Sequence, residues 1–366
     1  MNNDLLYKIA ITKVPKVGAI TVKNLVSYCG GAKAVFDATQ KELMKIPGIG
    51  RTLAENIRHH DVLEEAEKEL EFIDKNNVQC LFYTDEKFPQ RLKHFNDSPA
   101  ILYFKGNVEL NHHRIVSIIG TRTPTPQGKI ICEEIVAELQ KYNVLIISGL
   151  AYGIDVTAHR KSVSLNIPTV GVLGNGLSMI YPPEHRNISE KMMENGGILT
   201  EFTHRQGPDR EHFPMRNRIV AGMCDALIVV ETKEKGGSMI TAELANGYNK
   251  DVFAIPGRAR DKKFGGGNLL IKNHKAQLIE SAEDVIGIMR WEQFEKNRNI
   301  QKQLFVELSE KERVVVDILR NENEVAIDKL SYVAKLQPSE VSSLLLELEF
   351  KGMIKTLPGK RYMLVK

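Results

Sequence analysis

Six short, continuous apolar runs recur through the middle of this 366-residue chain, and they constrain its fold more than any other feature. The runs are IVSII (115–119), VLIIS (144–148), PTVGVL (168–173), GILTEF (197–202), ALIVVE (226–231) and DVFAIP (251–256). Because their hydrophobic residues do not alternate with polar ones, strands formed by these runs are expected to be buried on both faces. Segments with helical periodicity separate most of the runs. The pattern predicts an α/β fold with a doubly wound parallel sheet.

The first 75 residues carry helix signals and two glycine-centred turns, Val14–Gly18 and Ile46–Gly50. Two helices joined by such a turn form a helix-hairpin-helix unit, in which backbone N–H groups at the start of the second helix can approach a phosphate. The acidic stretch EEAEKELE (64–71) beside them favours another interpretation, in which the hairpins are packing units. Both interpretations stay open.

The last segment, residues 309–366, has the order helix, helix, helix and hairpin, which is that of a winged helix. Ser309 and Glu312 have the spacing of a capping box at the start of the first helix. The third helix begins after Pro338 and presents serine and glutamate outward, whereas a helix that reads DNA presents basic residues. The segment is therefore expected to contact protein or to be structural, with DNA reading as the alternative.

The composition excludes several classes of protein. With 50 Lys and Arg against 46 Asp and Glu, the net charge of +4 is too small to imply a nucleic-acid partner by itself. No apolar run is long enough to span a bilayer, and the acidic start lacks the basic region of a signal peptide. The four cysteines are far apart and have no histidine at ligand spacing. The sequence predicts a cytoplasmic protein with no metal, no other cofactor and no membrane partner.

The residues that follow the apolar runs carry the functional signal, because ligands of doubly wound folds bind beyond the carboxyl ends of the strands. A dinucleotide site would show G-x-G-x-x-G after the first run and an acid after the second. The chain has a single glycine, Gly120, and Ser148 instead, which argues against NAD. Glycines, hydroxyls and arginines recur after five runs, which favours a surface for several phosphates or a phosphate polymer. His159 is expected to be a hydrogen-bonded core residue, and no catalytic residue is predicted.

Six motifs in this region resemble those of the DprA/Smf family (DNA-processing protein A). They are GTRTPTPQG, SGLAYGIDVTAH, GVLGNGLSMIYPPEHR, FPMRNRIVAGM, GGSMITAE and DVFAIPG. The resemblance implies a protein that is not an enzyme, binds single-stranded DNA, protects incoming strands and loads a RecA-type recombinase during natural transformation. A single-strand-binding protein is a further candidate partner. The implied fold is an extended Rossmann-like core between a helix-hairpin-helix domain and a winged helix.

Together these features divide the chain into four parts. They are an all-α helix-hairpin-helix domain (1–75), a Rossmann-like DNA-binding domain (76–290), a polar linker (291–308) and a winged-helix domain (309–366).

The resemblance also implies which residues bind nucleic acid. Arg122 matches the arginine of the family's Gly-Ser-Arg loop, with Thr121 in place of serine. Arg186 stands where the family has a basic residue after its Tyr-Pro motif. The full predicted set is Gly120, Thr121, Arg122, Gly149, Arg186, Arg216, Asn217, Arg218, Gly237, Ser238 and Thr241.

The family further implies a homodimer formed through the α/β domain. The candidate surface is the segment 268–279, in which Leu269 and Leu278 are predicted to be the exposed members. The alternative is that the apolar residues of this segment belong to the core.

An enzyme is the alternative function. GGSMITAE also resembles the phosphate loop of nucleotide phosphoribohydrolases, in which Glu243 and Arg216 would act on a nucleoside monophosphate. Met239 stands where that loop has its second glycine, and the two flanking domains would be unexplained. A third possibility is a protein-interaction scaffold with a vestigial phosphate pocket.

Overall fold

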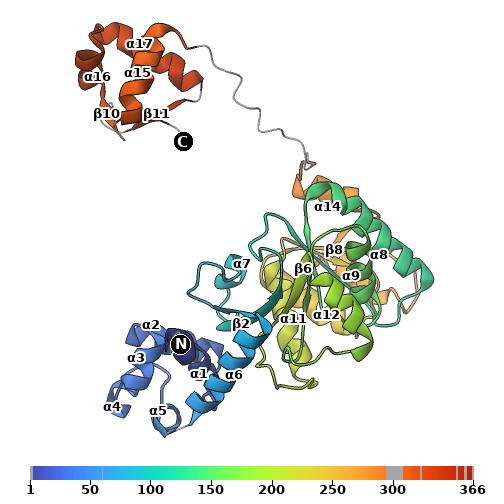
Figure 1. Ribbon diagram of the computed structural model, residues 1–366. Coiled ribbons are helices and arrows are strands. Elements are labelled where there is room, and N and C mark those ends of the chain that lie inside the picture. Colours follow the sequence, from blue (N-terminus) through green and yellow to red (C-terminus); the bar gives the residue numbers. More distant parts are fainter. Residues whose placement is uncertain are drawn as a thin grey trace. The chain divides into compact units, whose positions relative to one another are not determined.

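The structure is a computed structural model that describes residues 3–59, 61–293, 308–321, 324–351, 353–357 and 361–364. The chain divides into two compact units, Met1–Phe294 and Glu295–Lys366 (Figure 1). The second unit has its own hydrophobic core. Most of the predicted linker, residues 294–307, lies outside the described residues.

The first unit is built on a nine-stranded sheet with the order β1-β2-β6-β5-β4-β3-β7-β8-β9. The strands are β1 (Gln79–Phe82), β2 (Ile101–Gly106), β3 (Ile115–Ile119), β4 (Leu145–Ser148), β5 (Thr169–Val172), β6 (Gly196–Thr200), β7 (Ala226–Val229), β8 (Asp251–Ala254) and β9 (Gln277–Leu278). The six apolar runs form β3 to β8, and every pairing among them is parallel. The predicted doubly wound fold is confirmed.

The strand order creates a crevice at one edge of the sheet. From the central strand β3 the chain builds β4, β5 and β6 outward on one side, and then returns to build β7, β8 and β9 on the other. The connections that leave β3 and β7 therefore diverge toward opposite faces of the sheet. Ligands of open α/β sheets bind at this kind of topological switch point.

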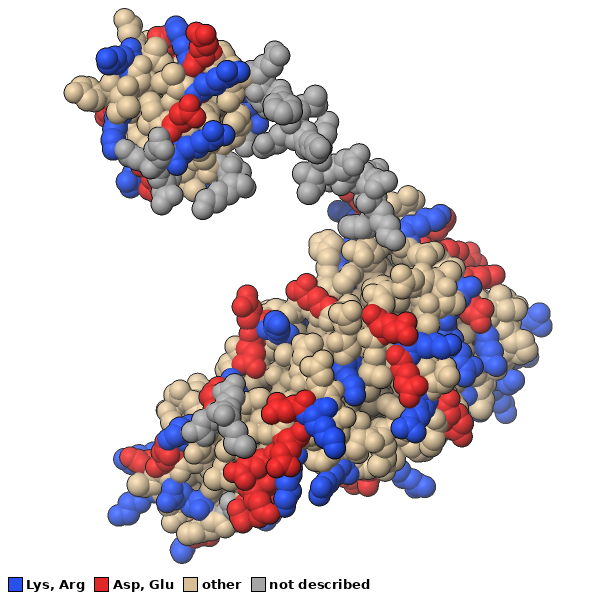
Figure 2. All heavy atoms as spheres, in the orientation of Figure 1, with Lys and Arg blue, Asp and Glu red and all other residues tan. Residues whose placement is uncertain are grey.

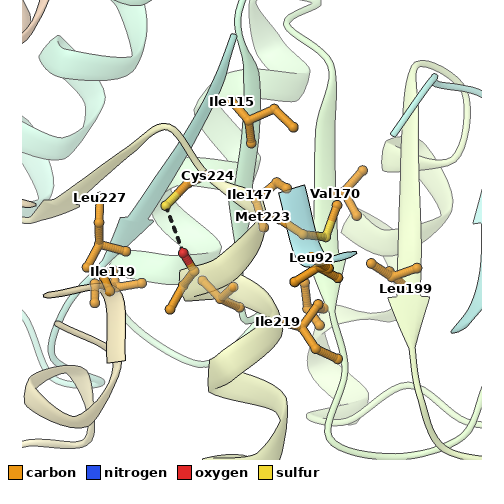
Figure 3. Packing of buried hydrophobic residues seen from close by; sticks show 14 of the residues in the cluster. Leu92, Ile115, Ile119, Ile147, Val170, Leu199, Ile219, Met223, Cys224 and Leu227 are labelled. Atoms are coloured by element: carbon orange, nitrogen blue, oxygen red, sulfur yellow. Dashed lines mark hydrogen bonds between the residues drawn. The ribbon is translucent and has the colours of Figure 1, made fainter. Parts of the chain in front are cut away.

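Helices cover both faces. One face carries α8 (Pro126–Leu139), α9 (Ile154–Ser164), α10 (Arg186–Met192) and α14 (Ala282–Met289), and the other carries α7 (Gln90–Lys93), α11 (His212–Met223), α12 (Gly237–Gly247) and α13 (Gly265–Lys272). Successive residues of a strand alternate between the two layers, so that Ile119 packs under α11 and α12 while Ile118 packs under α8 and α9. Figure 3 shows Ile219 and Met223 of α11 packed beside strand residues in the first of these layers.

The strands β1 and β2 were not anticipated from the apolar runs. They pair antiparallel with each other, and β2 pairs antiparallel with β6, so the sheet is mostly rather than wholly parallel. Phe82, Ile101 and Tyr103 of this hairpin belong to the hydrophobic cluster of the N-terminal helices. The hairpin thus joins the N-terminal helices to the sheet (Figure 1).

Those helices are α1 (Asn3–Lys13), α2 (Ala19–Cys29), α3 (Ala32–Asp37), α4 (Gln40–Leu43), α5 (Arg51–His59) and α6 (Val62–Asn76). The two predicted hairpins connect α1 to α2 and α4 to α5. Lys23 on α2 donates to the carbonyls of Phe95 and Asn96, at 3.3 and 3.2 Å, and to Ser98 Oγ at 2.7 Å. Lys23 therefore ties α2, the helix after the first hairpin, to the α/β body, while Pro15 and Lys16 of the first hairpin are exposed like Pro47 and Gly48 of the second.

The second unit contains α15 (Glu310–Asn321), β10 (Val325–Ala326), α16 (Ile327–Ala334), α17 (Pro338–Phe350), β11 (Ile354–Leu357) and β12 (Arg361–Leu364). A three-stranded sheet with the order β10-β12-β11 completes the predicted winged helix. Ser309 Oγ accepts from the N–H of Glu312, whose carboxylate accepts from the N–H of Ser309, as the capping-box pattern predicts. The outward face of α17 carries serine and glutamate beside the exposed Leu346 and Phe350.

Candidate nucleic-acid interface

A cavity of about 670 Å³ opens at the carboxyl ends of β3, β4 and β7, where the strand order reverses. It is lined by Ile119, Gly120, Thr121, Arg122, Gly149, Ala151, Asp155, Tyr181, Arg210, Phe213, Pro214, Arg216, Asn217, Val220, Thr232, Lys233, Gly236, Gly237, Ser238, Ile240 and Thr241. Figure 2 shows that acidic and basic side chains are interspersed over the visible face of the first unit. Because the net charge of the chain is only +4, a polyanion must be recognised locally, and this cavity is the candidate place.

The loop after β3 is held by the strand ends beside it. The N–H of Thr121 donates to the carbonyl of Glu231 at 2.6 Å, and the carbonyl of Thr121 accepts from the N–H of Ile154 at 3.2 Å. Gly153 has a φ of +82°, and a Cβ there would overlap the backbone of Thr121 and Arg122. Only glycine lets the start of α9 approach the loop this closely.

The buried carboxylate of Glu231 fixes the start of α8. Its Oε2 accepts from both the N–H and the hydroxyl of Thr125, each at 2.9 Å, while Thr125 Oγ1 accepts from the N–H of Gly128 at 3.0 Å. Thr125 is thus the N-cap of α8. The loop that carries Arg122 is consequently fixed at both ends, which presents the arginine from a rigid base.

Arg216 forms the floor of the cavity and is 4% exposed. Its Nη1 donates to the carbonyls of Gly149 and Val172 at the ends of β4 and β5. Burial lowers the pKa of Arg216 to about 10, so the guanidinium stays charged at neutral pH. Burial also raises the pKa of the neighbouring Asp155, whose carboxylate accepts from the N–H of Gly149 at 3.1 Å and of Ala151 at 3.4 Å.

The rim of the cavity is cationic and aromatic. Arg122, Arg210 and Lys233 are exposed there. The guanidinium of Arg122 lies 5.6 Å from the centre of the Phe213 ring, which is within the range of a cation–π contact. The ring centres of Phe213 and Tyr181 are 6.0 Å apart. The rim combines groups that attract phosphates with rings on which bases can stack.

The start of α12 supplies a third kind of contact. Gly236 is its N-cap, its first turn contains no acidic residue, and Gly237 and Ser238 line the cavity. Ser238 Oγ donates to Thr232 Oγ1 at 2.6 Å and so holds the first turn against the end of β7. Backbone N–H groups at such a helix start favour an anion.

Nine of the eleven residues predicted from the sequence line this cavity, namely Gly120, Thr121, Arg122, Gly149, Arg216, Asn217, Gly237, Ser238 and Thr241. Arg186 and Arg218 do not. Arg186 is exposed on α10, 3.6 Å from Glu190. Sequence reasoning missed Arg210 and Lys233, although Lys233 follows the fifth apolar run by two residues and so carried the same strand-end signal.

Arg218 lies on another face of α11 and lines a separate cavity of about 460 Å³. It pairs there with Glu201, whose pKa is raised to about 7 by burial. Val17 and Gly18 of the first hairpin and Ala19, the first residue of α2, line the same cavity. The end of this hairpin and the start of α2 thus lie beside the α/β body, which supports the interpretation of the hairpin as a packing unit.

The two leucines predicted to be exposed differ in their surroundings. Leu278 on the edge strand β9 is 50% exposed. Leu269 on α13 is half-buried and packs against the main hydrophobic cluster of the sheet, so for Leu269 the prediction of an exposed side chain was wrong. The amphipathic α13 turns Leu270 inward to the core, and its neighbour Leu269 lies at the border of the same face.

His159 is a core residue. It is fully buried, its Nδ1 lies 2.7 Å from Thr169 Oγ1, and burial lowers its pKa to about 3. The hydrogen bond to Thr169 agrees with the prediction, whereas Nε2 is buried without a partner within the described part of the chain.

Comparison with known families identifies this architecture. Residues 79–290 match the model of DNA recombination-mediator protein A, which spans more than half of the chain. The chain belongs to this family. Residues 303–360 match the DprA winged helix domain and residues 31–60 the helix-hairpin-helix motif. Across the described ranges, no helix is long and apolar enough to cross a membrane.

Relatives of this DprA-family chain extend over its whole length. It is 30% identical to Protein Smf of Synechocystis over 99% of both chains, and 38% identical to DNA processing protein DprA of Bacillus subtilis over 58% of this chain and 71% of that one. Among solved structures, DprA from Streptococcus pneumoniae superposes with a TM-score of 0.69 at 29% identity, covering 79% of this chain and 99% of that one. DNA processing protein A from Helicobacter pylori superposes with a TM-score of 0.53 at 30% identity, covering 59% and 97%.

Proposed function

We propose that this protein binds single-stranded DNA in the cavity at the switch point of its sheet. One observation carries the proposal: Arg122, Arg210 and Lys233 rim a cavity whose floor is the fixed cation Arg216 and whose wall is the start of α12. Of the residues that line it, Asp155 alone is acidic, and its carboxylate is bonded to backbone N–H groups. This arrangement attracts phosphates from several directions.

The dimensions and the chemistry of the cavity favour single-stranded DNA over duplex DNA. A cavity of this volume, enclosed by strand-end loops, can admit a flexible single strand but cannot follow both backbones of a stiff duplex. Phosphate contacts carry no base information, and stacking on Phe213 or Tyr181 would tolerate any base. We therefore expect a clear preference for single strands with little dependence on sequence.

The family supports the same assignment. The Helicobacter pylori structure describes a single-stranded DNA binding mode, and the family is described as a recombination mediator. We extend the proposal accordingly. The bound strand is protected and handed to a RecA-type recombinase, the protein acts as a homodimer without enzymatic activity, and a single-strand-binding protein is a second partner.

The enzymatic alternative is disfavoured by the position of its proposed acid. Glu243 does not line the cavity, because its carboxylate faces outward and pairs with Lys275 at 2.7 and 2.8 Å. Nη1 of Arg216, the other candidate, is committed to two backbone carbonyls. Incubation with nucleoside monophosphates should release no free base, and detection of free base would reinstate the alternative.

The decisive experiment is a salt titration of binding to single-stranded and duplex oligonucleotides of equal length. Arg122→Ala should weaken single-strand binding and lower the slope of log K against log salt by about 0.7, the value for one phosphate contact on a single strand. Arg160→Ala is the matched control, because Arg160 is an exposed arginine on α9 outside the cavity. Equal affinity for duplex and single strand, or an unchanged slope in a folded Arg122→Ala protein, would contradict the proposal.

Recombinase loading needs its own test. A RecA-type recombinase should assemble faster on a single strand coated with single-strand-binding protein when the wild-type chain is added. Arg122→Ala should lose this effect in proportion to its loss of DNA affinity. Stimulation that persists in a variant unable to bind DNA would separate the two activities.

A further inference from the structure

A second group of cations stands beside the cavity, on the connection between β8 and α13. We call residues 258–263 the basic loop. It carries Arg258, Arg260, Lys262 and Lys263, and Asp261 is its only acidic residue. All four cationic side chains are exposed, and none of them makes a hydrogen bond or ion pair within the part of the chain that the structure describes.

The backbone of the basic loop is held in a defined conformation. The Asn268 side chain clamps its base, accepting from the N–H of Gly257 at 3.0 Å and donating to the carbonyl of Gly257 at 3.1 Å. Within the loop, the N–H of Asp261 donates to the carbonyl of Arg258 at 3.0 Å, and the carboxylate of Asp261 accepts from the N–H of Lys263 at 2.9 Å. The one carboxylate of the loop thus shapes a turn and neutralises none of the cations directly.

The start of α13, which follows the basic loop, rests on the wall of the cavity. The N–H of Gly266 donates to the carbonyl of Thr232 at 2.9 Å, and Thr232 and Lys233 line the cavity. The strands β7 and β8 are direct neighbours in the sheet, with Val229 paired to Ala254. Since paired strands lie about 4.8 Å apart, the loop after β8 emerges immediately beside the loop after β7.

We propose that the basic loop is a second contact region for the phosphates of single-stranded DNA. The bound DNA continues from the cavity across the carboxyl end of β8 to this loop. This inference rests on the proposed function and adds the direction in which the bound DNA leaves the cavity. Four cations within six residues of one loop, without an ion pair among the described residues, repel one another, and a polyanion would relieve this repulsion. The bound single-stranded DNA therefore leaves the cavity past Lys233 toward the basic loop.

The test neutralises the loop without altering its backbone. The variant is Arg258→Gln with Lys262→Gln and Lys263→Gln. Arg260 is retained, because its φ of +66° lies in the left-handed region that glutamine disfavours. The matched control neutralises one exposed arginine and two exposed lysines that lie outside the cavity, the basic loop and the segment 268–279, namely Arg160, Lys141 and Lys191. The probes are oligothymidylates of about 4 and about 16 nucleotides, at the two ends of typical single-strand site sizes.

The loop variant should lose affinity for the long probe, and its slope against log salt should fall by about 2, since each lost contact contributes about 0.7. Its affinity for the short probe, which fits the cavity, should stay within about twofold of the wild type, and the control should match the wild type for both probes. A loop variant with the slope of the control would overturn the inference while Arg122→Ala still weakens binding. If Arg122→Ala also has no effect, the proposed function itself fails. An equal loss of affinity for the short and the long probe would also contradict the proposal that the DNA extends from the cavity to the basic loop.

Discussion

The guanidinium of Arg216 lies against the Cα of Gly149 and donates to its carbonyl oxygen. The same Nη1 reaches the carbonyl of Val172, so one side chain of α11 joins the ends of β4 and β5. A Cβ at position 149 would overlap the guanidinium. This close approach explains why a glycine follows β4, and it sets the floor of the cavity.

Gly149→Ala should therefore damage both the fold and binding. Overpacking a buried contact of this kind costs about 1–3 kcal/mol of the free energy of unfolding, and displacement of Arg216 should weaken single-strand binding. Gly287→Ala is the control, because a Cβ at this position on α14 would project into open space. It should stabilise the helix by up to about 1 kcal/mol. Urea unfolding of both variants checks the prediction, and a Gly149→Ala protein as stable as wild type would contradict it.

The loop that supplies Arg210 depends on a contact with the N-terminal helices. The buried carboxylate of Glu69 on α6 accepts from the N–H of His204 at 2.9 Å and from its Nδ1 at 2.8 Å, while Phe72 stacks on the imidazole at 4.4 Å. Because a carboxylate only accepts, Nδ1 of His204 carries a proton here. The N-terminal helices thereby help to position one rim of the cavity.

In Glu69→Gln one acceptor oxygen becomes an amide N–H₂ group, which faces one of these two donors as long as His204 keeps its proton on Nδ1. A buried unsatisfied donor costs about 1–3 kcal/mol of the free energy of unfolding. The slope of log K against log salt for DNA binding should fall by no more than about 0.7, because Arg210 is the one phosphate contact whose position depends on this loop. Glu71→Gln, at an exposed position on the same helix, is the control and should leave both quantities unchanged. A Glu69→Gln protein with wild-type stability would show that the contact contributes nothing.

The sequence predicts most of this fold because the apolar runs that mark β3 to β8 are local signals. Each run is continuous, since both of its faces are covered. The strand β2 was missed although ILYF (101–104) is itself a continuous apolar run. Its antiparallel pairing to β6 joins residues about a hundred positions apart in the chain, which no local pattern reports.

The candidate site is predictable to the extent that its residues follow strands. Arg122 and Gly237 are found in this way, and the structure brings them to one cavity. Arg218 follows the same motif as Arg216, but two residues along a helix rotate the side chain by about 200°, which turns it to another cavity. Arg210 and the basic loop lie several residues beyond their strands, where position depends on tertiary contacts such as those of His204 and Asn268.

Leu278→Glu tests the predicted homodimer. The side chain is half-exposed on the edge strand β9, so a charge there should change the free energy of unfolding by less than about 0.5 kcal/mol. It should nevertheless give a monomer in sedimentation velocity and lose avidity for long oligonucleotides, because two linked sites then no longer engage one strand. Ile288→Glu, at a position that is 41% exposed on α14, is the control. If the wild type is a monomer, or if the dimer persists in Leu278→Glu, β9 does not form the dimer interface.

The buried imidazole of His159 should make stability depend on acid pH. Its pKa falls from 6.5 to about 3 in the folded protein, because burial disfavours the charged ring and the charges of His185 and Arg216 add to the effect. Between these two values the unfolded chain binds a proton that the folded protein does not, so stability is lost as the pH falls, with a slope approaching 1.4 kcal/mol per pH unit. His159→Gln keeps a hydrogen-bonding group for Thr169 but cannot titrate, and it should flatten this part of the pH profile in urea unfolding. His94→Gln, at an exposed position, should retain the wild-type profile. If the difference in stability between wild type and His159→Gln is the same across this pH window, His159 is not the group responsible.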